Sequence, residues 1–262
     1  DQTIRCVGYS SYGEFGNSTT GVNYSPASNI KPTGLDGQIK AISCSYAHTL
    51  ALHEDGTVRA FGYNTSYGAL GDGTFTNRSS PVTVLGGLSN VKAIAAGGYS
   101  TVGFSLALTN GGEVYSWGYN GQGQLGHGDT ASRNLPAKIP GLTGVKAIAA
   151  GANHSLFLLE NGKIFYCGND GVNTAAGNVP VEVISPLLVD IQKIFAGQSA
   201  NSQGCSFAVN SRGEVFAWGN NATYGIFGLN NVTNQASPVK IPGISSISAI
   251  AVAKTGNKWS TF

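Results

Sequence analysis

VKAIAAG at residues 91–97, FSLALTNGGEVYSWG at 104–118 and GYNGQGQLGHGD at 118–129 form one unit of a repeating sequence. The first segment returns unchanged at 145–151 and in altered form as IKAISCS (39–45), IQKIFAG (191–197) and ISAIAVA (247–253). The second returns as HTLALHEDGTVRAFG (48–62), HSLFLLENGKIFYCG (154–168) and CSFAVNSRGEVFAWG (205–219). Internal repeats of this kind indicate the fold class more strongly than any single residue does.

Each unit has the pattern of about four short strands. An alternating run such as Ser105–Leu108 is typical of a half-buried strand, and the Asn-Gly and Asp-Gly dipeptides that follow are favoured in hairpin turns. A glycine loop and a short segment with proline end the unit, and proline is tolerated on an edge strand. A glycine, which we call the marker glycine, ends the second segment at positions 62, 118, 168 and 219 and has a counterpart at position 8, so the period is 50–56 residues. This pattern predicts an all-β propeller.

The two ends of the chain have complementary phases. Residues 1–8 align with the second half of the second segment at 55–62, and Trp259–Phe262 align with the start of that segment at 154–157. We therefore expect a single domain over residues 1–262, with about five four-stranded blades. The N- and C-terminal strands would complete one blade and so remove exposed sheet edges. The alternative is that the five repeats are a segment of a longer chain.

The combination of G-x-x-H-[ST]-L-x-L, G-x-V-x-x-W-G and G-x-x-G-Q-L-G-x-G resembles the repeat of the regulator of chromosome condensation (RCC1) family. It is clearest from Val91 to Leu142, and it covers essentially the whole chain. The resemblance implies a β-propeller. The family's founding activity is guanine-nucleotide exchange on the small GTPase Ran, with chromatin binding helped by a basic tail that this chain lacks. Members often have seven blades, so a whole member's activity does not transfer directly to five repeats.

Other activities of the family are not indicated by particular residues. Its plant ultraviolet receptors depend on Gly-Trp-Arg-His-Thr motifs, whereas Trp117, Trp218 and Trp259 lie in no such motif. A bacterial branch inhibits β-lactamases by covering the enzyme with one propeller face. That use is compatible with this chain, but no residue points to it.

The charge and hydropathy patterns exclude two classes of partner. Charged residues are 11% of the sequence, and the formal net charge is +2. A net charge this small gives no basic surface for nucleic acid, so we expect no nucleic-acid partner. The longest apolar stretches, such as Ile184–Ile194, are too short to cross a bilayer, so we expect no membrane insertion.

The histidines do not indicate catalysis. His48 and His154 share a repeat position that Phe104, Cys205 and Trp259 hold in other units, which is typical of a structural position. The sequence shows no metal-ligand spacing, nucleophile elbow or phosphate-binding loop. We therefore expect a protein that is not an enzyme and needs no cofactor.

The four cysteines are candidates for disulfides. Cys6 and Cys44 are 38 positions apart, and so are Cys167 and Cys205. Each pair falls in consecutive repeats, which allows two bridges between blades, although the two pairs differ in repeat phase. The alternative is that they are free thiols, since free cysteine is commonly buried.

Composition favours an extracellular or cell-surface location, with a cytoplasmic location as the alternative. Met is absent, charge is low and the cysteine count is even. Five Asn-x-Ser/Thr sequons fall in expected loops, where a glycan would fit. These candidate glycosylation sites are Asn17, Asn64, Asn77, Asn221 and Asn231.

Insertions single out one hairpin of the repeat as a candidate binding face. Residues 98–103, 198–204 and 254–258 lengthen the hairpin between the first and second strands, and such insertions often mark the binding face of repeat proteins.

The sequence predicts a protein-binding or structural module that presents one face to a protein partner or to itself. The alternatives are an intracellular exchange factor or regulator of a small GTPase, and a glycan-binding propeller. Candidate contacts are Tyr99, Ser100, Gln198, Asn201, Lys254 and Lys258.

Overall fold

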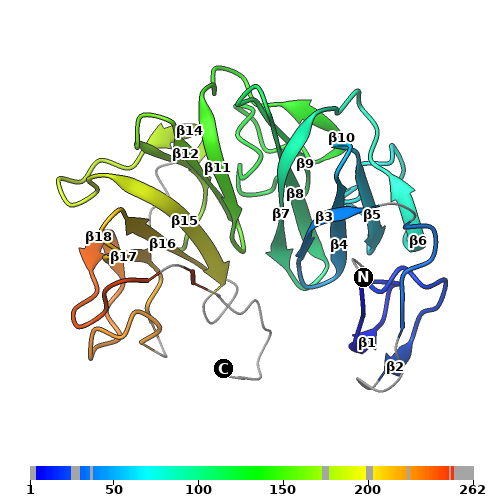
Figure 1. Ribbon diagram of the computed structural model, residues 1–262, viewed down its shortest axis with the longest axis horizontal. Coiled ribbons are helices and arrows are strands. Elements are labelled where there is room, and N and C mark those ends of the chain that lie inside the picture. Colours follow the sequence, from blue (N-terminus) through cyan, green and yellow to red (C-terminus); the bar gives the residue numbers. More distant parts are fainter. Residues whose placement is uncertain are drawn as a thin grey trace. The chain divides into compact units, whose positions relative to one another are not determined.

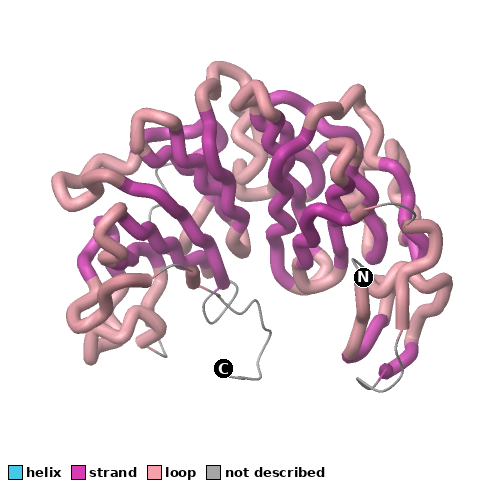
Figure 2. The backbone as a smooth tube through the Cα atoms, viewed as in Figure 1, coloured by secondary structure: helices cyan, strands magenta, loops and turns pink. Residues whose placement is uncertain are grey.

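A computed structural model describes residues 4–24, 30–35, 38–172, 177–198, 203–222, 225–247 and 249–250. No helix occurs in this part of the chain, so none there could cross a membrane. The strands pair only in antiparallel fashion in the described residues (Figure 1). Figure 2 shows that these residues form strands, loops and turns. Their bounds are β1 (Gly8–Ser10), β2 (Val22–Tyr24), β3 (Ile39–Cys44), β4 (His48–His53), β5 (Val58–Gly62), β6 (Arg78–Thr83), β7 (Val91–Tyr99), β8 (Val102–Thr109), β9 (Val114–Gly118), β10 (Arg133–Lys138), β11 (Val145–Ala150), β12 (His154–Leu159), β13 (Ile164–Gly168), β14 (Gly177–Glu182), β15 (Ile191–Gln198), β16 (Gly204–Asn210), β17 (Val215–Gly219) and β18 (Gln235–Lys240).

The chain divides into two compact units, Asp1–Asn120 with Ala131–Ile139, and Gly121–Thr130 with Pro140–Phe262. The first unit contains the pair β1-β2 and the sheets β3-β4-β5-β6 and β7-β8-β9-β10. The second contains β11-β12-β13-β14 and β15-β16-β17-β18. Each four-stranded sheet follows chain order, which confirms the four strands predicted for a repeat.

The N-terminal pair is the outer half of a further sheet. Gly8 faces Tyr24 across β1 and β2, as Gly62 faces Arg78 across β5 and β6. Strands β1 and β2 therefore hold the third and fourth positions of the repeat, which confirms the predicted phase of the N-terminus. The C-terminal strand expected to complete this blade falls in residues 251–262, outside the described residues.

The glycine that ends each third strand has a geometric cause. Gly62 and Gly118 have φ values of +110° and +98°, in the left-handed region. A β-carbon on Gly62 would lie 2.4 Å from the carbonyl oxygen of Ala47, and one on Gly118 would lie 2.7 Å from that of Gly103. Backbone conformation and lack of space therefore both exclude a side chain.

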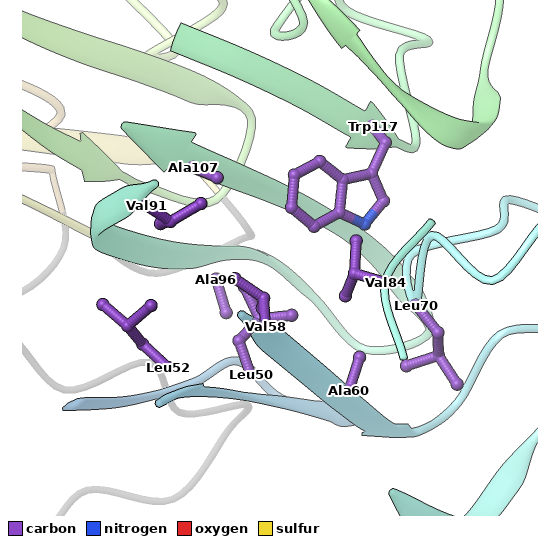
Figure 3. Close-up of a cluster of buried hydrophobic side chains, with 10 residues drawn as sticks. All are labelled: Leu50, Leu52, Val58, Ala60, Leu70, Val84, Val91, Ala96, Ala107 and Trp117. Atoms are coloured by element: carbon purple, nitrogen blue, oxygen red, sulfur yellow. The ribbon is translucent and has the colours of Figure 1, made fainter. Parts of the chain in front are cut away.

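Apolar side chains fill the space between the two four-stranded sheets of the first unit (Figure 3). Strand β4 is buried along its whole length, and its Leu50 and Leu52 share a cluster with Trp117 of β9. Because side chains alternate along a strand, Thr49 and His53 point to the opposite side of the β3–β6 sheet. The buried cluster is Leu50, Leu52, Val58, Ala60, Leu70, Val84, Val91, Ala96, Ala107 and Trp117.

The second unit repeats this packing. Leu156 and Leu158 of β12 share a cluster with Ala208 of β16, between the β11–β14 and β15–β18 sheets. Cys205 and Phe207 belong to a different cluster. Alternate residues of β16 therefore face opposite sides of the β15–β18 sheet.

A serine joins the neighbouring sheets of the first unit. Ser105 Oγ donates to the carbonyl oxygen of Ala69 at 2.8 Å, and Trp117 Nε1 donates to the same oxygen at 2.9 Å. His48 Nε2 lies 3.0 Å from Ser105 Oγ. Because the serine hydrogen is used on Ala69, His48 donates through Nε2, and its Nδ1 accepts from Ser45 Oγ at 2.6 Å. This buried histidine thus has a structural role.

Equivalent positions make the same contacts in the second unit. Ser155 Oγ and Cys167 Sγ donate to the carbonyl oxygen of Gln124 at 2.8 Å and 3.3 Å. His154 Nε2 lies 3.0 Å from Ser206 Oγ. The described hydrogen bonds of Ser155, unlike those of Ser105 and Ser206, involve no histidine.

Candidate protein-interaction face

Hairpins and loops of the first unit meet at one end of their strands. In an antiparallel meander, the first hairpin and the loop after the third strand lie at the same end. The backbone N–H of Tyr63 donates to Ala47 O at 2.7 Å, and that of Tyr119 donates to Gly103 O at 2.8 Å. Each loop is therefore joined at its base to the hairpin of its own sheet.

Tyrosines gather at this end. Tyr12 contacts Tyr63 edge-on, with ring centroids 4.9 Å apart, and Tyr67 contacts Tyr119 in the same way at 4.7 Å. Such T-shaped pairs are favourable beyond their buried area. These rings are half-buried, while Tyr46 in the β3–β4 hairpin is 50% exposed. We call this set the tyrosine face: Tyr12, Tyr46, Tyr63, Tyr67, Tyr99 and Tyr119.

The insertion at 98–103 contributes Tyr99 to this face by extending the β7–β8 hairpin. Tyr99 pairs with Val102 across a two-residue turn, in which Ser100 has a φ of +47°. Ser100 is exposed and Tyr99 is half-buried. The structure therefore brings these two predicted contacts to the end of the unit where the other tyrosines lie.

The remaining predicted contacts belong to the insertions at 198–204 and 254–258. In the second unit the insertion at 198–204 extends the β15–β16 hairpin, whose last pair is Gln198 with Gly204. The side chain of Gln198 is outside the described part of the chain. Three candidates lie wholly outside the described residues and stay predictions: Asn201, Lys254 and Lys258.

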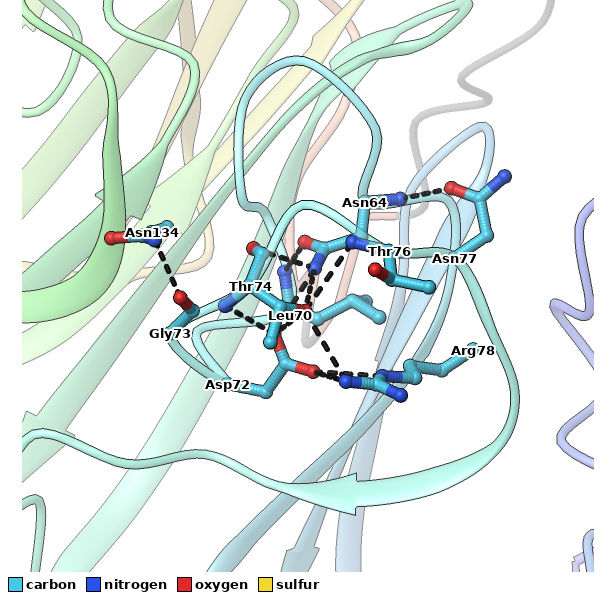
Figure 4. Close-up of polar contacts among 9 residues, drawn as sticks. All are labelled: Asn64, Leu70, Asp72, Gly73, Thr74, Thr76, Asn77, Arg78 and Asn134. Carbon is cyan, nitrogen blue, oxygen red and sulfur yellow. Dashed lines mark hydrogen bonds and ion pairs between the residues drawn. The ribbon is translucent and has the colours of Figure 1, made fainter.

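Asn64 fixes the loop that carries Tyr63 and Tyr67 (Figure 4). Its Oδ1 accepts from the backbone N–H of Leu70 at 2.9 Å, and its Nδ2 donates to the carbonyl oxygen of Thr74 at 3.0 Å. A second asparagine, at position 77, accepts through Oδ1 from the backbone N–H of Asn64 at 2.7 Å. The loop is thus held in one conformation by its own polar groups.

The charges of the same loop are paired with each other. Asp72 Oδ2 accepts from Nε and Nη2 of Arg78, both at 2.8 Å. Burial by itself raises the pKa of Asp72, but hydrogen bonds from Thr74 and Arg78 outweigh it and hold the pKa below its usual value. The ion pair therefore adds little net charge to the tyrosine face.

The structure corrects two of the predicted glycosylation sites. Asn64 and Asn221 are 1% and 0% exposed. Asn221 Nδ2 donates to the carbonyl oxygen of Asn231 at 3.0 Å, as Asn64 Nδ2 does to the equivalent residue of its loop. A glycan on either Nδ2 would displace the loop that this atom holds. Asn120 has the same repeat position, and its Nδ2 also donates to a carbonyl oxygen of its own loop, that of Ala131, although it is in no sequon. An asparagine that recurs at one repeat position with or without a sequon was the sequence signal for a structural role.

The other sequons are sterically compatible with a glycan. Asn231 is exposed, and Asn17 and Asn77 are half-exposed. In Figure 4 the Nδ2 of Asn77 points away from Asn64. Glycosylation at these three positions stays a prediction.

All four cysteines lie in the described residues and carry free thiols. A Cys167–Cys205 bridge is incompatible with the structure. Cys167 pairs with Ser155, which points away from the β15–β18 sheet, whereas Cys205 lies in the cluster on the far side of that sheet. The two side chains therefore point in opposite directions with backbone between them, which no disulfide can span. The Cys6–Cys44 bridge meets no such obstacle and stays a prediction.

The described residues present aromatic and hydrogen-bonding groups at the tyrosine face. Among them, no group of three or more His, Cys, Asp or Glu side chains could hold a metal ion. Trp117 and Trp218 are buried between sheets, so neither can stack on a sugar or another ligand. Half-exposed tyrosines on a fixed loop can instead make aromatic contacts and hydrogen bonds to a partner.

Family models place the chain among known proteins. A model described as "Regulator of chromosome condensation (RCC1) repeat" matches residues 111–158 and 212–257. A second model with the same description matches 39–68, 91–124 and 145–173. The chain belongs to the RCC1 repeat family. Its sheets are therefore RCC1 blades, and the predicted family and β-propeller fold are confirmed.

Relatives and solved structures support this placement. The RCC1 domain-containing protein RUG3, mitochondrial, of Arabidopsis thaliana is 32% identical over 225 residues, 79% of this chain and 47% of its own length. The ultraviolet-B receptor UVR8 of the same plant is 27% identical over 239 residues, 89% of this chain and 52% of its own. This RCC1 chain thus spans about half the length of these two relatives.

Two solved structures share the fold. Human WBSCR16 superposes with a TM-score of 0.77 at 24% identity, over 92% of this chain and 63% of that one. Prp20p of Saccharomyces cerevisiae gives 0.69 at 24% identity, over 91% of this chain and 57% of that one, and its structure was reported with its binding to Gsp1p and histones. At this identity the likeness concerns the fold alone.

Proposed function

We propose that this RCC1 chain is a non-enzymatic protein-binding module whose tyrosine face receives a protein partner. The observation that carries the proposal is the grouping of six tyrosines on hairpins and loops at one end of the first unit. Tyrosine offers a large, rigid contact surface with a polar tip and loses little conformational entropy on binding.

The composition of these loops supports a protein partner. Residues 63–77 read YNTSYGALGDGTFTN, and the hairpin tip at 98–103 reads GYSTVG. Loops rich in Tyr, Ser, Gly and Asn are those that antibodies use to bind proteins. Because Asn64 and Asn77 already fix the loop 63–77, little ordering would be needed on binding.

The test compares variants of equal exposure at opposite ends of the sheets. Tyr46 is 50% exposed on the tyrosine face, and Leu85 is 49% exposed. Leu85 follows Val84, whose N–H donates to Val58 O at the far end of β5 from Gly62. The N–H of Leu85 itself donates to Gly71 O at 2.9 Å, and the alanine substitution keeps this backbone bond. Wild-type protein, the double variant Tyr46→Ala/Tyr99→Ala and the control Leu85→Ala are each used to capture proteins from the source cells, with quantitative mass spectrometry.

We expect the double variant to lose at least one protein that wild type and Leu85→Ala both retain. The double variant must also keep the wild-type midpoint of urea unfolding, because the loss of binding can then be attributed to the altered surface and not to unfolding. Equal capture by all three proteins would contradict the proposed face. If the wild type captures only itself, sedimentation velocity of the same variants shows whether the face joins copies of the chain.

The alternatives have their own readouts. A regulator of a small GTPase would accelerate release of fluorescent GDP from Ran, whereas the proposed module gives the uncatalysed rate. A glycan-binding propeller would give signal on a glycan array, and the burial of Trp117 and Trp218 argues against it.

We also propose an extracellular or cell-surface location, supported by the accessible sequons at Asn17, Asn77 and Asn231. The intact mass of natively purified protein tests it. A hexose-spaced excess that maps to any of these three asparagines is expected, and a bare polypeptide mass would favour the cytoplasm.

A further inference from the structure

Cys6 and Cys44 each have equivalent residues in other repeats, and the structure shows what those residues contact. Counting from the marker glycines, Cys6 corresponds to Ala60 and Tyr166. Counting along the first strand, Cys44 corresponds to Ala96 and Ala196. Ala60 and Ala96 belong to one cluster between neighbouring sheets of the first unit, and Tyr166 and Ala196 belong to one cluster between neighbouring sheets of the second. The same two positions therefore face each other in both units.

The contacts of the two cysteines agree with this placement. Cys6 N–H donates to Ile30 O at 3.0 Å, and its Sγ lies 3.8 Å from Phe15 O. Thr49 Oγ1 lies 3.7 Å from Cys44 Sγ and donates to Glu14 O at 3.1 Å. Cys6 Sγ thus lies at Phe15, and Cys44 Sγ is linked through Thr49 to the adjacent Glu14, which places both sulfurs in the same neighbourhood.

Electrostatics supports the short separation. Burial raises the pKa of the Cys6 thiol, and the nearby Cys44 raises it further. Cys44 is exposed at the end of β3, whereas Cys6 is half-buried. An oxidant from solvent would therefore meet Cys44 first, and Cys6 is placed to react with the product.

We propose that Cys6 and Cys44 form a disulfide that fastens the β1–β2 segment to the β3–β6 sheet. With oxidised glutathione as the oxidant, the Cys44 thiolate attacks one of its sulfurs, forms a mixed disulfide and releases glutathione. Cys6 loses its proton to solvent and attacks the Cys44 sulfur, which forms the Cys6–Cys44 bond and releases the second glutathione. Two thiols are oxidised and one glutathione disulfide is reduced. The bond closes a loop and restricts the unfolded chain.

The other cysteines provide an internal control. Cys167 and Cys205 are fully buried, and burial raises the pKa of Cys205 to about 12 and that of Cys167 strongly as well. Neither thiol is therefore available to a soluble oxidant in the folded protein.

The experiment treats the reduced full chain with oxidised glutathione, alkylates under denaturing conditions and maps peptides without reduction. We expect the number of free thiols to fall from four to two, with the loss of two hydrogens in the intact mass and one cross-linked peptide pair containing Cys6 and Cys44. The bridged protein should unfold at higher urea, and a reductant should reverse the shift.

Two variants make the result specific. Cys6→Ser should stop at a glutathione adduct on Cys44, and Cys205→Ser should still form the bridge. A wild-type chain that stops at a stable adduct on Cys44, forms only intermolecular disulfides or keeps four free thiols would overturn the proposal. None of these outcomes depends on whether the tyrosine face binds a partner.

Discussion

Ser105→Ala tests the contact between sheets against a control that the repeat itself supplies. In wild type, Ser105 Oγ donates to Ala69 O at 2.8 Å and receives a hydrogen bond from His48 Nε2 at 3.0 Å. After the substitution Ala69 O keeps the bond from Trp117 Nε1. The Nε2 of His48, which is 1% exposed, loses its 3.0 Å hydrogen bond to Ser105 in either tautomer.

The expected loss of stability follows from the two hydrogen bonds that Ser105 makes, to Ala69 O and to His48 Nε2. A buried polar atom left without its partner costs about 1–3 kcal/mol, and an ordinary hydrogen bond contributes about 1 kcal/mol. Ser155→Ala removes a bond of the same kind to Gln124 O, which keeps the bond from Cys167, and it leaves no histidine unsatisfied. We therefore expect Ser105→Ala to lower the free energy of unfolding by about 2–4 kcal/mol and Ser155→Ala by about 1 kcal/mol.

Urea unfolding followed by tryptophan fluorescence measures both values, because Trp117 and Trp218 are buried in the native state. Ser206→Ala should resemble Ser105→Ala, since Ser206 Oγ also lies 3.0 Å from a histidine Nε2. If Ser155→Ala costs as much as Ser105→Ala, the histidine does not contribute as argued.

Three further predictions follow from the loops. Asn64→Ala removes the acceptor of the buried Leu70 N–H and the donor to the half-buried Thr74 carbonyl, and it should cost about 2–4 kcal/mol in urea unfolding. Gly118→Ala meets a carbonyl oxygen at 2.7 Å and should cost more than about 2 kcal/mol, whereas Gly162→Ala, also at positive φ but in open space, should cost about 1 kcal/mol. Because the pKa of Asp72 is lowered in the folded state, its contribution is present above about pH 4 and is lost as the pH falls below that value, so Asp72→Asn should flatten the acid limb of a stability–pH curve.

The sequence predicts the repeat architecture well because the repeat is a local signal. Marker glycines such as Gly62 are fixed by a close approach of the backbone within one sheet, and the alternation of β4 and β12 reflects packing within each unit. The extended β7–β8 hairpin that carries Tyr99 and Ser100 could also be located from an insertion alone.

The sequence offered only a weak signal for the contacts made inside the loops and none for the contacts made across sheets. Asn64 and Asn221 resemble glycan acceptors, but their amides hold loops from inside. Equal spacing made Cys167 and Cys205 resemble a pair, yet strand alternation turns them to opposite sides. The pairing of Tyr67 with Tyr119 joins residues 52 positions apart in two repeats, and composition carries no sign of it.

The central claim, that the tyrosine face binds a protein, is tested most directly by hydrogen exchange of this chain with and without a captured partner. We predict protection of the hairpin tips at 45–47 and 98–103 and of the loop that carries Tyr63 and Tyr67. The turns at 54–57 and 110–112, at the other end of the same strands, should exchange at unchanged rates. Protection of those turns with none at the hairpin tips would contradict the account.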